Sequence, residues 1–366
     1  MVSERLMVKK GVFDMKKILR IFVLVSIALV LISCKGSGGG NSGSGGGGSS
    51  PATPAPAGTN GTNTGTGAQS GSSSSSTTTT TTTPNTILIS TIPWNFVRVT
   101  GSTFRSDSKL NCRTTDGTTY TSFFGNEYHI NTGKTWTIDD FYILDHEVTQ
   151  AEYQAVMGSN PSHFNGTSGT EAAAGESQAN RPVERVSWYH TLVFCNKKSI
   201  AEGLTPCYAI SGKTNPDEWG AVPERDTTDA TWDAVTCDFS ANGYRLPTEE
   251  EWAYAAFGGA EGVQADNPTD FAGTDDVANL GNYAWWSQNS DQKTHEVKKK
   301  LPNSLGLYDM SGNVFEWCWD YQIGRHNFYG GSNGHTDYQC FIAYHLHGYA
   351  SQFFWDVGFR VARTAQ

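Results

Sequence analysis

Residues 34–85 set the first limit on what this chain can fold into, because most of them are Gly, Ser or Thr and almost none has an apolar side chain. Such a tract has too little apolar surface to offset the entropy lost on ordering, so we predict a disordered tether. On a random-coil average of roughly 5–6 Å per square root of residue number, it reaches about 40 Å. Folding is left to residues 86–366, which are long enough for one large domain.

Residues 1–33 have the pattern of a lipoprotein signal peptide. Lys16 and Lys17 precede an apolar run that ends at Cys34, which would be lipidated. A plain transmembrane helix is the alternative, but the run is near the lower limit of about 17 residues for a span. We therefore expect a protein of the bacterial cell envelope, anchored by its N-terminal lipid at the outer membrane and exposed on the cell surface.

The net charge limits the possible partners, and the cysteines limit the possible zinc sites and disulfides. A net charge of −10 argues against a nucleic acid, which needs a basic face. Six cysteines remain when Cys34 is set aside, and their spacings match no zinc pattern. Cys207 and Cys237 flank an insertion, and they are the predicted disulfide in this exported chain.

Short elements alternate with turn signals along the domain. Residues 141–144 (FYIL) predict a strand. Three helices are predicted to begin after Thr149, Ser187 and Thr248, and the first has a capping box with Glu152. Many loops and few amphipathic helices indicate an α+β domain with large irregular regions.

The segment from 326 to 356 differs from its surroundings in composition. It holds nine aromatic residues and four of the chain's nine histidines, but no Lys, Arg, Glu, Met or Pro. No apolar period of 2 or 3.6 organises it, so we predict neither a buried strand nor a buried helix there. Aromatic and small polar residues without long charged side chains are typical of a contact surface.

Five motifs occur in order along the domain. They are 147–153 (EVTQAEY), 182–188 (PVERVSW), 243–252 (GYRLPTEEEW), 306–317 (GLYDMSGNVFEW) and 358–360 (GFR). Together they resemble the formylglycine-generating enzyme (sulfatase-modifying factor) family. The resemblance covers the domain from about residue 90 and implies a C-type-lectin-like fold. It does not by itself imply the reaction, because function belongs to the site.

The resemblance also states what an enzyme of this family would need. Its oxidases bind copper through two closely spaced cysteines near the C-terminus, and thiolate pairs suit Cu(I). Here only Cys340 is present, and His335 stands where the partner would be. The iron-dependent branch uses histidines of a separate helical domain, which this chain lacks. We therefore predict a protein that is not an enzyme, with a divergent formylglycine-generating-type oxidase or other metal-dependent enzyme as the alternative.

Two sets of residues are weighed as metal ligands. His345 and His347 alternate and would face the same way on a strand, with His335 nearby, although an exposed contact surface is the favoured interpretation. The resemblance places a structural Ca²⁺ beside Asp309 and Glu316, whereas the alternative is that both simply hydrogen-bond their loop. No cofactor is required. The sugar-binding triplets of Ca²⁺-dependent lectins do not occur.

The departures from the enzyme pattern resemble the variable proteins of diversity-generating retroelements, in which adenine-directed mutagenesis rewrites Asn codons. Such codons can yield Tyr, His, Phe, Leu, Ser, Asp, Gly, Ile or Val but never Lys, Glu, Met, Gln or Trp, so Gln339, Gln352 and Trp355 would be fixed positions or come from other codons. Gly330, Gly331, Ser332, Gly358 and Phe359 would keep the backbone constant. The predicted ligand contacts, with Phe341, Phe353 and Phe354 equally compatible with core positions, are Tyr329, Asn333, His335, Asp337, Tyr338, Phe341, Tyr344, His345, His347, Tyr349, Phe353, Phe354 and Asp356.

The combined prediction is a surface-displayed binding protein with a variable C-terminal segment. Its partner would be a protein or glycan on another cell or host, and the chain is expected to act as a monomer. The sequence does not specify the ligand.

Overall fold

The computed structural model of the protein describes residues 94–105, 135–264, 269–322 and 324–366. The chain divides into two units, residues 1–80 and 81–366, and all described residues belong to the second. The predicted signal peptide and the whole of the predicted tether, with Cys34, lie outside the described residues and stay predictions. Within the described ranges, no helix is both long and apolar enough to cross a membrane.

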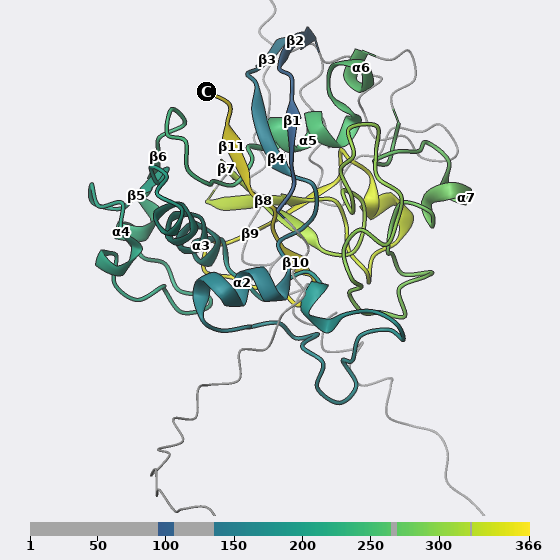
Figure 1. Ribbon diagram of the computed structural model, residues 1–366, viewed down its shortest axis with the longest axis horizontal. Helices are drawn as coiled ribbons and strands as arrows, with labels where there is room; N and C mark the ends of the chain where they lie inside the picture. The colour runs from purple at the N-terminus through teal and green to yellow at the C-terminus, as the bar shows by residue number, and fades with distance from the viewer. Residues whose placement is uncertain (1–93, 106–134, 265–268, 323) are drawn as a thin grey trace, which may run out of the picture. The chain divides into compact units, whose positions relative to one another are not determined.

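The second unit is a mixed α+β structure with long connecting loops (Figure 1). Its strands are β1 (Phe96–Val99), β2 (Ser102–Arg105), β3 (Thr135–Ile138), β4 (Phe141–Leu144), β5 (Tyr208–Ala209), β6 (Thr236–Cys237), β7 (Phe315–Gln322), β8 (Arg325–Tyr329), β9 (His345–Gly348), β10 (Val357–Gly358) and β11 (Ala362–Thr364). Its helices are α2 (Gln150–Met157), α3 (Trp188–Ala201), α4 (Ala230–Asp233), α5 (Glu249–Phe257), α6 (Gly259–Gln264) and α7 (Val277–Leu280), with 3₁₀ turns η2 (Gln178–Asn180), η3 (Pro216–Glu218) and η4 (Asp337–Cys340).

The three predicted helices begin where their capping residues indicated. Thr149 and Glu152 form a reciprocal capping box at the start of α2, and Thr248 and Glu251 form another at α5. At α3, the Ser187 side chain accepts a hydrogen bond from a first-turn amide. Each cap satisfies backbone N–H groups that have no partner inside the helix. The predicted strand at 141–144 is also present, as β4.

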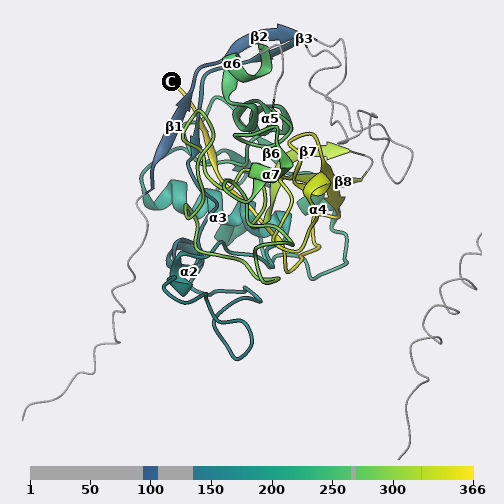
Figure 2. The ribbon, with the colours of Figure 1, turned by 90° about the vertical axis from the view of Figure 1, so that its right-hand side faces the viewer.

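Two sheets bring distant parts of the sequence together (Figures 1 and 2). One has the order β1-β4-β11, so the last strand of the chain pairs with β4 in antiparallel fashion. The other has the order β10-β7-β8-β9, in which β10 runs parallel to β7. Residues 325–358 therefore supply three of the four strands of the second sheet, while β7 carries the preceding motif.

The two faces of the β7–β8 pair contribute to two hydrophobic clusters. Trp317 and Phe328 lie opposite each other and pack into the cluster that contains Trp188. The neighbouring Cys318 and Tyr329 point the other way, into the cluster around α5. This follows from the alternation of side chains along a strand. Both sides of the central strands are consequently buried.

The prediction that residues 326–356 contain no buried strand is wrong. β8 is buried along most of its length, and β9 pairs with it in register. The polar residues of β8 conceal the apolar pattern expected of a buried strand. His326 stacks on Trp188 with ring centroids 3.6 Å apart, and Asn327 Nδ2 donates to Glu249 Oε2 at 2.8 Å. Polar side chains that find partners in the core can occupy buried strand positions.

The predicted disulfide is also not formed. Cys207 and Cys237 are close, because β5 and β6 pair with Tyr208 opposite Cys237, yet both are free thiols. Burial raises the pKa of the Cys207 thiol to about 11. Cys112 lies outside the described residues.

Candidate functional site

A buried ion pair joins the last two motifs. The Arg360 guanidinium donates from Nε to Oε2 of Glu316 and from Nη2 to Oε1, each at 2.6 Å. Trp252 Nε1 donates to the same Oε2 at 2.7 Å, and Arg360 Nη1 donates to the Leu144 carbonyl at 3.1 Å. Burial lowers the pKa of Arg360, but the charge and hydrogen bonds of Glu316, together with the charges of Glu147 and Asp309, more than offset this, so the pKa stands above its ordinary value. A pair with this many partners fixes the backbone on both sides of the C-terminal segment.

The first motif holds the same region from another direction. Glu147 accepts from Asn313 Nδ2 at 2.7 Å and from the Val314 amide at 3.0 Å. Burial, followed by the charges of Asp309 and Glu316, raises the pKa of Glu147 well above its ordinary value. The motifs that suggested the family therefore meet at the start of β7.

The contacts of Asp309 and Glu316 do not fit a calcium ion shared by the two. Both Glu316 oxygens already accept from the cationic Arg360, and one also accepts from Trp252. Asp309 Oδ2 accepts from the Lys298 amide at 2.8 Å, which leaves only Oδ1 without a partner. Burial raises the pKa of Asp309 to about 6. In the described ranges, no group of three His, Cys, Asp or Glu side chains could hold a metal ion.

Cys340 and His335, at the position of the paired copper-binding cysteines of the family's oxidases, do not form a thiolate pair. Cys340 is fully buried, and burial raises the pKa of its thiol. A Cβ at Gly331 would lie 2.8 Å from the Cys340 Sγ, so only glycine fits beside it. His335 Nδ1 hydrogen-bonds Ser332 Oγ at 2.6 Å, and its ring contacts Phe315.

Five of the predicted contact residues are buried, so the expectation of a surface is wrong for four of them, while Phe341 takes the core position that the prediction left open. The five residues are Tyr329, Asn333, Phe341, Tyr344 and Asp356.

The aromatic members of this buried set pack in the core. Tyr329 stacks on Trp252 with ring centroids 5.3 Å apart, and its hydroxyl donates to Glu249 Oε2 at 2.9 Å. Phe341 lies against Phe271 with centroids 4.8 Å apart. Their partners belong to α5 and to the loop before α7, far from them in sequence.

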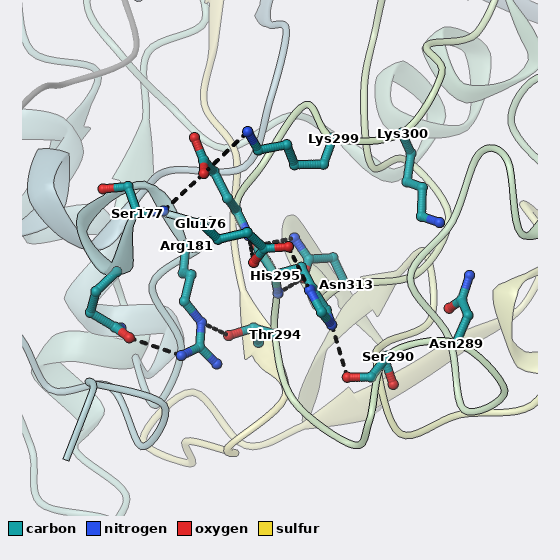
Figure 3. Close-up of polar contacts among 12 residues, drawn as sticks. Glu176, Ser177, Arg181, Asn289, Ser290, Thr294, His295, Lys299, Lys300 and Asn313 are labelled. Carbon is teal, nitrogen blue, oxygen red and sulfur yellow. Dashed lines mark hydrogen bonds and ion pairs between the residues drawn. The ribbon is translucent and has the colours of Figure 1, made fainter. Parts of the chain in front are cut away.

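Asn333 is held by a polar cluster on neighbouring loops, and Figure 3 shows Ser290, His295 and Asn313 of that cluster. Its amide and its Nδ2 both donate to the Asn313 carbonyl, at 2.8 and 3.0 Å. Ser290 Oγ donates to the Asn333 carbonyl at 2.5 Å. His295 joins Asn313 through its amide and hydrogen-bonds both Glu176 and the Ser290 carbonyl, each at 2.8 Å. Asn333 is therefore part of the support of the segment.

Asp356 closes a second polar group. Ser332 Oγ lies 3.2 Å from Asp356 Oδ2, and His335 Nδ1 lies 3.4 Å from the same oxygen. Burial lowers the pKa of His335, whereas burial raises that of Asp356. Because Ser332 and Asp356 share one nitrogen of the ring, this group differs from a catalytic Ser-His-Asp relay, in which each ring nitrogen has its own partner.

The remaining predicted contacts are partly or fully exposed. His347 and Tyr349 are exposed, with Tyr349 at 43%. Register places His347 opposite Asn327, so His345 and His347 point to the same side of the sheet, as predicted. Burial lowers the pKa of His345 to about 4. The half-buried members are His335, Asp337, Tyr338, His345, Phe353 and Phe354.

The structure adds residues to this face that the sequence did not indicate. Trp355 is 43% exposed and makes an edge contact with Phe164. Arg325 lies over the Tyr349 ring, with 5.0 Å between the guanidinium carbon and the ring centroid. Arg185 and Arg225 lie over the Phe353 ring at 5.6 and 5.0 Å. We call Arg185, Arg225, Arg325 and residues 345–355 the open face.

Comparison with known proteins agrees with this architecture. The sulfatase-modifying factor enzyme 1-like domain matches residues 95–365. The chain belongs to this family. Its structure is similar to that of Treponema denticola variable protein 1, with 34% identity and a TM-score of 0.62, covering 76% of this chain and 97% of that one. The predicted family resemblance and the predicted C-type-lectin-like α+β fold are both confirmed.

Curated relatives match shorter parts. The chaperone protein LppX of Paenibacillus barcinonensis is 39% identical over 199 residues, which are 51% of this chain and 65% of that protein. A formylglycine-generating enzyme of Streptomyces coelicolor is 32% identical over 110 residues, 27% of this chain and 33% of the enzyme. The chain thus spans less than two thirds of the length of these curated relatives.

Proposed function

We propose that the protein is a variable binding protein that recognises a macromolecular ligand through its open face. The observation that carries this proposal is the likeness to Treponema denticola variable protein 1, which extends over 97% of that chain. The family fold supplies a rigid support, because the Glu316–Arg360 pair and Asn313 fix both edges of the segment. Exposed aromatic side chains at the edge of such a support suit recognition by shape.

The structure narrows the set of proposed ligand contacts. His347 and Tyr349 are exposed, Phe353 and Phe354 are half-buried, and all four come from one stretch of chain. Asp337, Tyr338, His335 and His345 are half-buried and form the margin of the set. The five buried positions would act indirectly, by setting the height and tilt of the open face. Changes at those positions would risk the fold, because their partners lie in the core.

The source and setting of this variation remain part of the proposal. Adenine-directed rewriting of Asn codons by a retroelement would supply the Tyr, His, Phe and Asp residues of the segment. A lipid on Cys34 and the tether at 34–85 would hold the domain away from an outer membrane, with the open face directed to a partner on another cell or host. Exposed variable aromatics would then meet that partner first.

The DNA sequence around the gene provides the test. We expect a reverse transcriptase gene and a near-copy of the 3′ coding segment that differs only at adenines. Independent isolates should differ at codons 347, 349, 353 and 354 while Gly330, Gly331 and Phe359 stay the same. An unchanged segment in all isolates would overturn the proposal.

A further inference from the structure

Arginines from three separate parts of the chain converge on the exposed aromatics of the open face. Arg185 precedes α3, Arg225 lies in the loop before α4, and Arg325 begins β8. The chain as a whole carries a net charge of −10, so this gathering of cations does not reflect a generally basic surface. In the described parts of the chain, neither Arg185 nor Arg325 forms an ion pair.

Contacts along the backbone make the arginines one continuous surface. Tyr349, under Arg325, exchanges hydrogen bonds with Gln352: the Gln352 amide donates to the Tyr349 carbonyl at 2.9 Å, and the Tyr349 amide donates to Gln352 Oε1 at 3.0 Å. Phe353, under the other two arginines, is the next residue. The guanidinium groups therefore follow one another along residues 349–353.

The loops that carry Arg185 and Arg225 are shaped to hold this segment. The Arg185 amide donates to the Phe354 carbonyl at 2.9 Å, and Ser351 Oγ donates to the Thr227 carbonyl at 2.6 Å. Arg185 and Asp226 adopt left-handed backbone conformations, with φ of 60° and 62°. Residues other than glycine rarely adopt such conformations, and those that do are often found at binding sites. Here they place both arginines beside Phe353.

One acidic group belongs to this surface and must be counted. Asp226 lies 3.5 Å from Arg225 Nε and accepts from Gln352 Nε2 at 2.8 Å, so it partly neutralises Arg225. Arg185 and Arg325 still leave two guanidinium groups whose N–H donors are free of carboxylates among the described residues. A guanidinium stacked on a ring keeps its edge donors available for a planar carboxylate.

We propose that the open face binds a protein partner through clustered carboxylates, with Arg185, Arg225 and Arg325 as fixed anchors beside the variable aromatics. The proposal rests on the proposed function and names the chemistry of its partner. Arginine and large aromatics are the residues that contribute most at protein–protein interfaces, which favours an acidic stretch of polypeptide over a glycan. Variable residues would select the shape of the partner, while the arginines would select its charge.

The test measures binding of a labelled decaglutamate peptide to the full-length chain by fluorescence anisotropy at low salt. We expect binding that weakens with added salt and a Kd at least about tenfold higher in the triple variant R185Q/R225Q/R325Q. A matched control removes the same charge at Arg98, Lys197 and Lys213, which pair with Asp140, Asp217 and Glu218. The R98Q/K197Q/K213Q variant should bind almost as well as the unmodified chain.

Several outcomes would overturn the inference. Equal weakening in both triple variants would show general electrostatic attraction only. Tighter binding of a heparin oligosaccharide, lost in the same arginine variant, would assign the face to sulfated glycans. No binding of decaglutamate by the unmodified, folded chain would also refute it. If the 3′ segment nevertheless varies among isolates, the proposed function stands and only the carboxylate partner fails.

Discussion

Tyr329 and Tyr349 flank the two paired strands of the C-terminal segment, yet one is buried and the other is exposed. Their surroundings explain the difference. Tyr329 lies under α5, where Trp252 and Glu249 cover it, whereas Tyr349 has only the Arg325 guanidinium over its ring. Residues 326–344 thus mostly form core and residues 345–356 mostly form surface. These two halves of the segment have similar residue compositions. The exposure of their side chains is therefore decided by which distant elements of the fold pack against each half.

The largest expected effect separates these two tyrosines. Tyr329→Ala should lower the free energy of unfolding by about 3–5 kcal/mol, because it opens a cavity against Trp252 and leaves Glu249 without a hydroxyl donor. Tyr349→Ala should change it by no more than about 0.5 kcal/mol. Chemical denaturation of both variants measures the contrast. Equal losses of unfolding free energy would mean that residues 326–344 and residues 345–356 do not differ in their packing.

A second contrast uses acid and the histidines of the two strands. Burial lowers the pKa of His326 to about 4, below its unfolded value, so its contribution to stability is present above pH 6.5 and is lost as the pH falls toward 4. His326→Phe keeps the stacking on Trp188 and removes this loss. As the pH falls from 6.5 to 4, the free energy of unfolding of the variant should rise by roughly 1–3 kcal/mol relative to that of the unmodified chain.

The exposed His347 is the control for this pH prediction. Denaturation curves of His347→Gln from pH 7 to pH 4 should nearly parallel those of the unmodified chain. A flat difference for His326→Phe across that range would contradict the burial of His326.

The third contrast concerns Asn333. We expect Asn333→Ala to lower the free energy of unfolding by about 1–3 kcal/mol. The substitution removes the Nδ2 donor to the Asn313 carbonyl and leaves a gap next to Ser290. His347→Ala, at another predicted contact position, should be neutral within about 0.5 kcal/mol. Thermal melts of both variants test this, and a neutral Asn333→Ala would return Asn333 to the contact surface.

The smallest effect is a coupling inside the segment. A double-mutant cycle with His335→Gln and Asp356→Asn should show an interaction of roughly 0.5–1 kcal/mol, because both groups meet at Ser332. The same cycle with His347→Gln in place of His335→Gln should give additive effects. Coupling in the second cycle, or none in the first, would remove the argument that the two positions act together.

Much of the scaffold was predictable because its signals are local. The caps at Thr149, Ser187 and Thr248 were correct, and the ordered motifs predicted the family and fold. Burial in the C-terminal segment was not predictable, since Tyr and Asn suit surface and core alike. Their fate depends on Trp252 and Asn313, which lie elsewhere in the chain.

The arginines of the open face were missed for a related reason. Arg185, Arg225 and Arg325 stand alone in three loops or strand ends, and no spacing links them. Only the folded chain brings them to Phe353 and Tyr349. The surroundings of the predicted calcium ligands were likewise not predictable, because Arg360, which donates to both Glu316 carboxylate oxygens, lies in another motif.

A paired selection tests the central claim most directly. One display library of the full chain randomises His347, Tyr349, Phe353 and Phe354, and the other randomises Tyr329, Asn333, Phe341 and Tyr344, both against immobilised lysozyme as the probe. We predict folded, probe-specific binders from the first library and almost none from the second. Binders from the second library, or none from the first despite well-folded members, would contradict the assignment of ligand recognition to the open face.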